Sequence, residues 1–445
     1  MTRSLIKVLA AATGLLVCGA QANAAPFDAL AAKAEIGKVV ARDTARLDAL
    51  YKDLHAHPEL AFQEKATAAK MAKQMREAGF EVTEGVGGTG VVAILRNGPG
   101  PVVLVRTELD ALPVEERTGL PYASHARAIW NGVATPVAHV CGHDIHMATW
   151  VGAGRALAAL KARWKGTLIF VAQPAEEGVR GAKAMLDDGF IARFGKPDYG
   201  FALHVTPAPA GQVSYRAGPI SSTSDSLEIT FLGRGAHGSA PASSIDPVLM
   251  AARFTVDVQS VISREKDPTA FGVVTIGSIE AGTVGNVIPD RSTVRGTIRT
   301  QDEAVRTKIL AGVTRTAKAV AEMAGAPAPT IALEPGGKMV VNDMDLTERT
   351  AAVFRAAFGA DAVPFPMVMS GSEDFSEFIL AGIPSVYFLI GGLEPEIFAQ
   401  AMRGERALPI NHAPDFAPAP EPTIRVGATA MALAVMSVTQ GTLQH

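Results

Sequence analysis

Apolar and polar positions follow one another along the chain in blocks that predict an ordered series of helices and strands. Helical spacing, with apolar residues three and four positions apart, covers residues 44–56, 64–78, 147–164, 346–358 and 423–438. Short apolar runs rich in β-branched residues predict strands at residues 91–95, 102–106, 167–172 and 385–390. Strands that alternate with helices in this way are typical of an α/β domain with a mainly parallel sheet.

The pattern changes after a Pro-rich stretch at residues 207–209 and returns to the first style near residue 335. In between, it predicts strands and helices in the order β-α-β-β-α-β, at residues 226–233, 247–263, 271–279, 294–300, 303–324 and 330–333. This order is that of a ferredoxin-like unit. We therefore expect a catalytic α/β domain made of residues 25–217 and 335–445, interrupted by an α+β lid at residues 218–334.

The N-terminal segment has the parts of a secretory signal peptide. Arg3 and Lys7 form a basic start, and residues 8–20 are apolar throughout. Ala22-Asn23-Ala24 then supplies the small residues that a signal peptidase recognises. An amphipathic helix of the folded domain is the alternative, but the run has no polar face. The pattern predicts a cleaved segment at residues 1–24 and a mature chain in the periplasm or outside the cell.

Composition limits the partners of the mature chain. The 445 residues include 41 Lys or Arg and 44 Asp or Glu, so there is no basic excess of the kind that binds nucleic acid. No later apolar run reaches the roughly 18–20 residues of a membrane helix. The hydrophobic fraction of 48% instead predicts a large core. We expect no binding to nucleic acid or to a membrane.

Residues 85–90, Gly-Val-Gly-Gly-Thr-Gly, match the letters of a dinucleotide-binding fingerprint. That fingerprint requires a helix after the glycines, because the helix N-terminus holds the pyrophosphate. Here the predicted strand at residues 91–95 follows, so we interpret the glycines as a turn.

The segment His139-Val-Cys141-Gly-His143-Asp144-Ile-His146 places three of the ten histidines and a cysteine ahead of a predicted helix. Cys18 leaves with the signal, so Cys141 is the only thiol of the mature chain and has no disulfide partner. A lone cysteine is often an apolar core filler, but such a core would bury several polar side chains without partners. Thiolate and imidazole are ligands of Zn²⁺ and related ions, so the segment predicts a metal site in which Asp144 orients a ligand.

Further polar residues stand at predicted strand ends or in loops. Glu176 and Glu177 follow the strand at residues 167–172, His204 ends another apolar run, and His412 lies in a loop before the last helix. Each of these alone is more typical of a solvated turn or a structural histidine. Beside the Cys/His segment, two adjacent carboxylates can divide the work, one facing the metal and the other facing water as general base.

These residues belong to motifs that follow one another over almost the whole mature chain: His57-Pro-Glu-Leu, Arg106-x-x-x-Asp110-Ala-Leu-Pro113, Cys141-Gly-His-Asp144, Gln173-Pro-Ala-Glu-Glu177, His204, Gly235-Ala-His237, Asn286-Val-Ile-Pro289, Gly296-Thr-Ile-Arg299, Ser372-Glu-Asp-Phe375 and His412. In this order they resemble the motifs of co-catalytic metallopeptidases and aminoacylases, in particular hippurate hydrolases and hydrolases of indole-acetyl-amino acid conjugates. One position departs from that branch, because Glu108 stands where it has Asp.

The resemblance implies two divalent ions, Zn²⁺, Mn²⁺ or Co²⁺, with Cys141 between them and Glu176 as general base. The implied ligands are Cys141, His143, Glu177, His204 and His412. In the lid, it implies that His237, Asn286 and Arg299 hold the tetrahedral oxyanion and the substrate's carboxylate. We expect closure of the lid to bring these three side chains together. The resemblance also implies a homodimer through the lid, in which His237 can reach the partner's site.

We therefore expect metal-dependent hydrolysis of the amide bond of N-acyl or N-aroyl amino acids, through a metal-bridged water. A dipeptidase or exocarboxypeptidase shares every ligand and is the alternative. A non-catalytic binding protein on the same fold is a further alternative, which the adjacent Glu176 and Glu177 disfavour because a binder needs no base. The sequence names neither the acyl group, nor the amino acid, nor the metal.

Overall fold

The apolar strands of the α/β part form an eight-stranded sheet in the computed structural model, which describes residues 27–440. The strands lie in the order β1-β2-β6-β3-β7-β18-β8-β17. Their bounds are β1 (Glu81–Val86), β2 (Gly90–Asn97), β3 (Val102–Glu108), β6 (Gly166–Gln173), β7 (Tyr199–Pro209), β8 (Val213–Tyr215), β17 (Ala362–Pro364) and β18 (Ser385–Leu393). The central strands β6, β3, β7 and β18 are parallel, and antiparallel pairs occur toward the edges. The expected sheet is confirmed, and the predicted signal segment lies outside the described residues.

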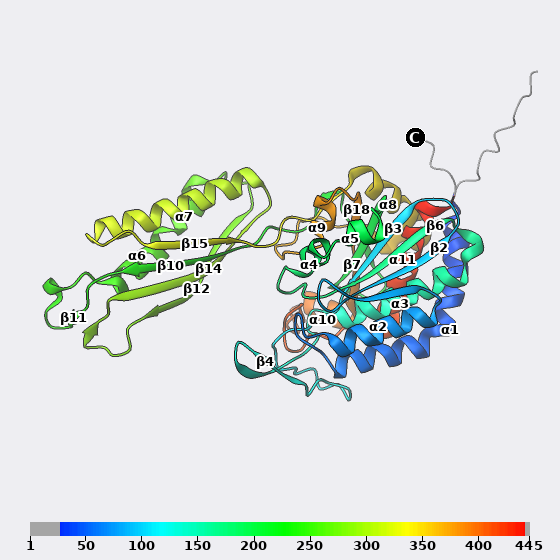
Figure 1. The fold of residues 1–445 in the computed structure, drawn as a ribbon, viewed down its shortest axis with the longest axis horizontal. Coiled ribbons are helices and arrows are strands. Elements are labelled where there is room, and N and C mark those ends of the chain that lie inside the picture. Colours follow the sequence, from blue (N-terminus) through cyan, green and yellow to red (C-terminus); the bar gives the residue numbers. More distant parts are fainter. Residues whose placement is uncertain (1–26, 441–445) are drawn as a thin grey trace, which may run out of the picture.

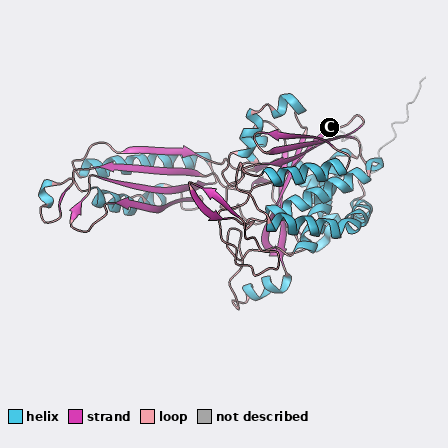
Figure 2. Ribbon diagram, turned by 60° about the horizontal axis from the view of Figure 1, so that its bottom comes forward, coloured by secondary structure: helices cyan, strands magenta, loops and turns pink. Residues whose placement is uncertain are grey.

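Helices cover both faces of this sheet because its strands are apolar on both sides. In β2, Val91 and Ala93 pack into one core layer, whereas Val92 and Ile94 pack into the other. The first layer contains α1 (Ala29–Ala56), α2 (Lys65–Glu77), α3 (His143–Ala159), α8 (Met344–Phe358) and α11 (Pro420–Thr439). The second contains α4 (Gly181–Asp187), α5 (Phe190–Phe194) and α9 (Ser376–Leu380). Figure 2 shows the strands of the sheet between helices.

The helix α11 is apolar along its length because it lies in the core. By length and composition this helix could cross a membrane, but 83% of its most apolar stretch is buried inside the protein. It contacts α1, α3 and α8, whose apolar faces point toward it. Burial against these helices accounts for its composition.

The lid contains a second, antiparallel sheet with strand order β12-β14-β10-β15. Its elements are β10 (Asp225–Leu232), α6 (Pro247–Asp257), β12 (Gly272–Ala281), β14 (Arg291–Thr300), α7 (Glu303–Met323) and β15 (Thr330–Pro335). This strand order, with the chain order β-α-β-β-α-β, is the ferredoxin-like topology. The two helices cover one face of the sheet, where Phe231, Phe254 and Val313 meet. The lid projects from the α/β domain as an elongated body (Figure 1).

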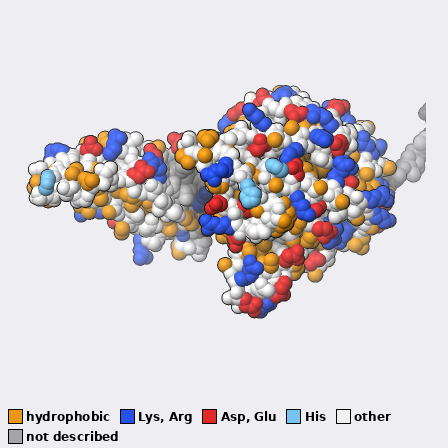
Figure 3. All heavy atoms as spheres, turned by 90° about the horizontal axis from the view of Figure 1, so that it is seen from below, with side chains coloured by type: hydrophobic (Ala, Val, Ile, Leu, Met, Phe, Trp, Pro, Cys, Tyr) orange, Lys and Arg blue, Asp and Glu red, His pale blue; other side chains and the backbone are white. Residues whose placement is uncertain are grey.

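The far end of the lid carries a small ribbon of β11 (Ala236–His237) and β13 (Val287–Ile288), well away from the α/β domain (Figure 1). Large apolar side chains are exposed on the lid, among them Leu249, Val256 and Val284. Figure 3 shows apolar side chains on the lid surface, and acidic and basic side chains intermixed over the visible face of the α/β domain. Contiguous exposed apolar surface is typical of a contact region.

Three predicted helices and one unpredicted hairpin differ from the sequence pattern. The helix α1 begins at Ala29 and not at residue 44, and Asp28 caps it by accepting the N–H of Ala31. The helix α3 begins at His143 and not at residue 147, because Gly142 takes a left-handed φ of +91° and ends the preceding loop. The helix α6 stops at Asp257, and a π-helical turn (Val261–Glu265) follows it. The hairpin of β4 (Arg127–Trp130) and β5 (Val133–Pro136) turns on Asn131-Gly132, a turn signal present in the sequence. The remaining elements are η1 (Lys161–Arg163), β9 (Gly218–Pro219), η2 (Pro241–Ser243), β16 (Val341–Asn342), η4 (Gly359–Asp361) and α10 (Pro395–Met402).

Candidate metal centre

The predicted metal ligands come from separate segments that meet near the carboxyl ends of the central parallel strands. Cys141 and His143 stand at the start of α3, and Glu177 lies in the turn between β6 and α4. His412 lies in the loop between α10 and α11. His204 lies within β7, which continues to Pro209, so the sequence pattern placed the end of this strand too early. Parallel strands bring such positions to one edge of a sheet, where sites of α/β proteins form.

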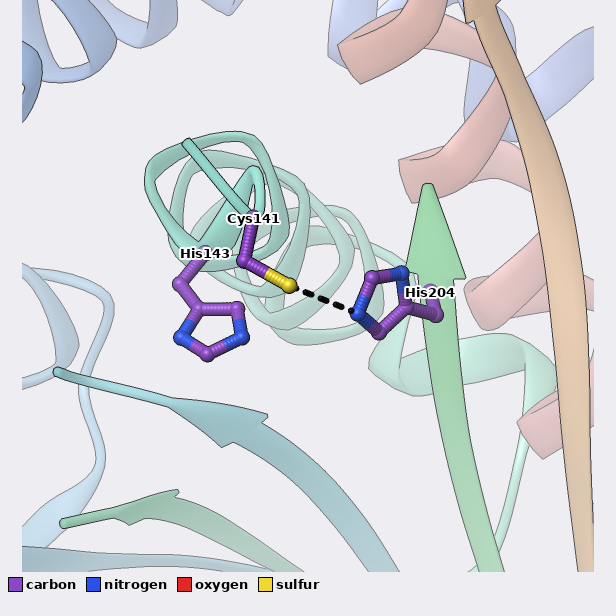
Figure 4. A group of neighbouring side chains, drawn as sticks. All are labelled: Cys141, His143 and His204. Carbon is purple, nitrogen blue, oxygen red and sulfur yellow. Dashed lines mark hydrogen bonds between the residues drawn. The ribbon is translucent and has the colours of Figure 1, made fainter. Parts of the chain in front are cut away.

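Short distances join the ligand atoms. The Cys141 Sγ lies 3.4 Å from His204 Nε2 and 3.3 Å from His412 Nε2. His412 Nε2 is also 3.5 Å from Glu177 Oε2. Figure 4 shows the Cys141 and His204 side chains directed at each other with His143 beside them. Among the close groups of donor atoms, Cys141–His143–His204 and Cys141–Glu177–His412 share the thiol, and a third group, His143–Glu176–Glu177, lies between them.

The donor atoms fit divalent ions. His143 Nε2 and Glu177 Oε1 are buried and have no hydrogen-bond partner among the described residues. The other ring nitrogen of His143, Nδ1, lies 2.8 Å from the backbone oxygen of Asp110 and donates to it. The lone pair on Nε2 is therefore free and faces the cluster. Buried polar atoms without partners are costly, and a cation at this position would satisfy both.

Burial sets the charge of these groups. It lowers the pKa of His143 and lowers that of His204 to about 4, so both rings are neutral, as metal ligation requires. Burial also raises the pKa of Glu177 to about 7. For Cys141, burial and then the Glu177 and Glu176 carboxylates raise the pKa of the thiol. A cation held at this position would stabilise the thiolate at neutral pH.

His146 does not belong to this ligand set, although it lies in the same segment. Its Nε2 accepts the backbone N–H of Val205 (2.8 Å), so its Nδ1 carries the proton and donates to Glu108 Oε2 (3.0 Å). Both ring nitrogens are thus occupied. The longer side chain of Glu108, where the related motif has Asp, is used to reach this histidine and the guanidinium of Arg106.

The turn that carries Glu176 and Glu177 is tightly held. The two carboxylate oxygens of Asp110 accept the backbone N–H groups of Glu176 and Glu177, each at 3.0 Å. Ala175 and Val179, on either side of the pair, have positive φ of 50° and 53°. Such conformations cost of order 1–3 kcal/mol each for residues other than glycine and persist where the surroundings impose them. The turn is therefore built to fix the directions of two side chains.

The two carboxylates both lie near His143 Nε2, Glu176 Oε2 at 3.6 Å and Glu177 Oε1 at 4.0 Å, but only Glu177 also lies within 4 Å of His412 (3.5 Å). Burial, then Glu373 and Glu177, raise the pKa of Glu176. Glu176 makes no ion pair with Lys or Arg within the described residues.

A buried ion cluster supports this side of the site and has no counterpart in the sequence-based prediction. Arg106 donates to Glu373 Oε1 (2.7 Å) and to Asp374 Oδ1 (3.0 Å), and Tyr387 donates to Glu373 Oε2 (2.9 Å). The only sign of this cluster in the sequence is that Arg106 and the Glu373-Asp374 pair each belong to one of the family motifs described above. Their contact depends on the pairing of strands that are distant in the sequence.

His55 links α1 to the start of α3. Its Nδ1 lies 2.6 Å from Asp144 Oδ2 and its Nε2 lies 3.0 Å from Glu116 Oε1. Burial by itself would lower the pKa of His55, but the two hydrogen bonds raise it to about 10. Asp144 thus orients a helix next to the ligands, and not a ligand directly.

This pair of contacts predicts a pH-dependent stability. Because the folded-state pKa of His55 lies above its ordinary value of 6.5, its contribution is complete below about pH 6.5 and is lost as the pH rises toward 10. The free energy of unfolding should therefore fall across that range. Denaturant titrations at about pH 7 and about pH 9.5 measure the difference. The same fall in a His55→Gln variant would contradict the assignment.

The structure divides the predicted lid residues between two places. His237 and Asn286 are neighbours at the far end of the lid, in and beside the β11–β13 ribbon. Arg299 lies at the base of the lid, where its Nη1 donates to Ser372 Oγ (2.9 Å). In this structure the three side chains do not lie together within one chain, since the length of the lid sheet separates them (Figure 1).

Coordination of Cys141 has a direct chemical test. Cys141→Ala is expected to lose both bound metal and activity, because the thiol is the atom shared by the donor groups of His204 and His412. In the wild-type protein the thiol should resist alkylation until a chelator is added. Mass spectrometry of the alkylated protein measures this, and equal rates with and without chelator would count against coordination.

A thiol, imidazoles and carboxylates grouped around a shared atom at the edge of a parallel sheet define a hydrolase that uses a pair of metal ions. The chain matches the family described as Peptidase family M20/M25/M40 over residues 104–402, and it belongs to that family. It is therefore a metallo-amidohydrolase or carboxypeptidase, as its motifs predict.

Known proteins support this placement. Over 345 residues the chain is 34% identical to thermostable carboxypeptidase 2 of Saccharolobus solfataricus, covering 76% of this chain and 84% of that protein. It is 39% identical to the hippurate hydrolase of Campylobacter jejuni over 255 residues, 57% of this chain and 64% of that enzyme. Among solved structures, a dinuclear metal-binding peptidase of the M20 family from Bacillus subtilis superposes with a TM-score of 0.70 at 29% identity, covering 89% of this chain and 99% of that one.

Proposed function

We propose that this protein hydrolyses the amide bond between an acyl or aroyl group and an amino acid with a free carboxylate. The proposal rests above all on the shared Cys141 thiol with the buried Glu176 carboxylate beside it. Within the family, the hippurate hydrolase and the N-acetylcysteine deacetylase of Bacillus subtilis, 36% identical over 286 residues, are named for substrates of this kind. A metallohydrolase acting on small amides or peptides is the class to which the chain belongs.

Each residue has a task in this reaction. Cys141, His143, Glu177, His204 and His412 would hold two divalent ions (Zn²⁺, Mn²⁺ or Co²⁺), which would supply polarisation of the amide carbonyl and activation of a water molecule. Glu176 accepts the proton of that water and delivers it to the leaving amine. The backbone hydrogen bonds donated to Asp110 and the left-handed residues of its turn hold the Glu176 carboxylate in position for both transfers.

The lid supplies the remaining polar groups, and we propose that it does so in a homodimer. His237 Nδ1 accepts the N–H of Ser239 (3.1 Å), so the neutral ring carries its proton on Nε2 and can donate it to an oxyanion. His237 and Asn286 lie too far along the lid to meet their own metal centre (Figure 1). We assign the pairing with the substrate carboxylate to Arg299, whose guanidinium lies at the lid base beside Ser372. The exposed apolar side chains of the lid favour contact with a second copy.

An exocarboxypeptidase is the second candidate, because the carboxypeptidases of Saccharolobus solfataricus are similar over most of the chain. Both reactions need the same ligands and the same carboxylate pocket. They differ in what stands on the acyl side of the bond, an N-acyl cap or an amino acid residue.

We also propose that residues 1–24 direct the protein to the periplasm or outside the cell. The basic start, the apolar run and Ala22-Asn23-Ala24 support this. Fractionation of cells and sequencing of the mature N-terminus test it, and an N-terminus before residue 24 would contradict it.

A substrate panel on metal-reconstituted protein tests the activity. Release of free amino acid from hippurate, N-acetyl amino acids and dipeptides should require added Zn²⁺, Mn²⁺ or Co²⁺ and stop with a chelator. A preference for capped substrates would support the first candidate, and a preference for dipeptides the second. Turnover that survives complete metal removal would exclude both.

A further inference from the structure

Glu64 is a buried carboxylate whose side chain turns away from its own helix. It occupies the N-cap position of α2, where an acidic side chain ordinarily binds the first backbone N–H groups of the helix. Glu64 makes no such bond, and the nearby Glu59 binds Ala66 and Thr67 N–H instead (3.2 and 2.7 Å). The Glu64 side chain is fully buried and has no Lys, Arg or His partner among the described residues.

Both oxygens of Glu64 are used by the walls of the metal centre. Oε1 accepts the backbone N–H of Ala175 (2.9 Å), and Oε2 accepts the hydroxyl of Thr89 (2.6 Å). Ala175 is the residue directly before Glu176 and has a positive φ of 50°. Glu64 is therefore the acceptor that holds the first, left-handed residue of the turn.

Two buried carboxylates accept the three consecutive backbone N–H groups of this turn. Asp110 holds those of Glu176 and Glu177, and Glu64 holds that of Ala175. Without Glu64, Ala175 keeps no acceptor for its N–H and is free to leave the left-handed region, which L-residues rarely occupy. That change rotates the peptide that joins Ala175 to Glu176, while Asp110 still holds the N–H groups of Glu176 and Glu177.

We propose that Glu64 is a positioning residue for the general base: it fixes Ala175 in the left-handed conformation that directs the Glu176 carboxylate into the site. This inference rests on the proposed role of Glu176. It predicts a loss that falls on catalysis and not on metal binding, because Glu176 directly follows Ala175, whereas Glu177 lies one residue further along the segment that Asp110 holds.

The test compares Glu64→Ala with Glu64→Gln in the full-length, metal-reconstituted enzyme. Glu64→Ala is expected to lower kcat about 10- to 100-fold, as small misplacements of a catalytic group do, with KM and bound metal within about twofold of wild type. Glu64→Gln keeps an oxygen for Ala175 N–H and an amide that can bond Thr89, so it should restore most of kcat. Glu59→Ala is the matched control, since it removes a helix cap in the same loop without touching Ala175.

A second readout does not depend on activity. Backbone hydrogen exchange measured by mass spectrometry should accelerate in peptides containing residues 174–180 for Glu64→Ala, with or without metal, and stay near wild type for Glu64→Gln. If Glu64→Ala does not fold, Thr89→Val should show the same signature with a smaller fall in kcat, about threefold or more.

Several outcomes would overturn the inference. The first two are an unchanged kcat in Glu64→Ala and an equal loss of kcat in Glu59→Ala. The third is a loss of bound metal in parallel with kcat. If Thr89→Val is used because Glu64→Ala does not fold, an unchanged kcat in Thr89→Val is the fourth. Failure of the role of Glu176 is recognised separately, because Glu176→Gln would then keep its activity. If Glu176→Gln is inactive and Glu64→Ala is fully active, only the positioning role is wrong.

Discussion

Replacing Glu176 with Gln is expected to reduce kcat by about 10²–10⁴-fold while bound metal stays near the wild-type level. The amide keeps the size of the side chain and its place in the turn, but it cannot accept the proton of the attacking water. The Glu176 carboxylate is buried beside His143 and is not part of the Cys141–Glu177–His412 group. Steady-state kinetics with metal analysis of the same samples measure both quantities.

Glu177→Gln is the matched control for this variant, since it changes the neighbouring carboxylate in the same turn. It should reduce bound metal, because Glu177 Oε2 lies 3.5 Å from His412 Nε2 and Oε1 has no hydrogen-bond partner among the described residues. If Glu176→Gln loses metal and Glu177→Gln keeps it, the roles within the pair are reversed.

Mixing two inactive variants, His237→Ala and Glu176→Gln, is expected to restore activity in heterodimers. His237→Ala alone should lower kcat about 10²–10³-fold with little effect on metal, the range seen when one oxyanion donor is removed. If the lid of one subunit serves the site of the other, one site of each heterodimer combines an intact Glu176 with an intact His237. Up to half of the sites in a heterodimer then become active.

The measurement requires confirmed subunit exchange, for example by native mass spectrometry of tagged and untagged chains. Mixing His237→Ala with wild-type protein controls for simple dilution. Absence of recovery in exchanged heterodimers would mean that His237 acts within its own chain or takes no part.

The spacing of apolar residues along the chain was sufficient to predict the architecture, because the core helices and strands of this protein keep the apolar spacing typical of helices and strands. The alternation in β2, with Val91 and Val92 on opposite faces, is readable from the sequence, as is the β-α-β-β-α-β order of the lid. The glycines at residues 85–90 form the turn between β1 and β2, as the absence of a following helix indicates. Boundaries were less accurate at α3 and α6, where a left-handed glycine and a π-helical turn decide the ends.

The sequence by itself determined the kinds of donor, the order of elements and the pairing of a Cys/His segment with adjacent carboxylates. Only the tertiary structure distinguished His143 from His146, because that choice depends on where each second ring nitrogen donates or accepts. It also separated Arg299 from His237 by the length of the lid and turned Glu64 toward Ala175. Ligand choice and side-chain direction depend on hydrogen bonds between segments far apart in the chain, and spacing along the sequence carries no information about these bonds.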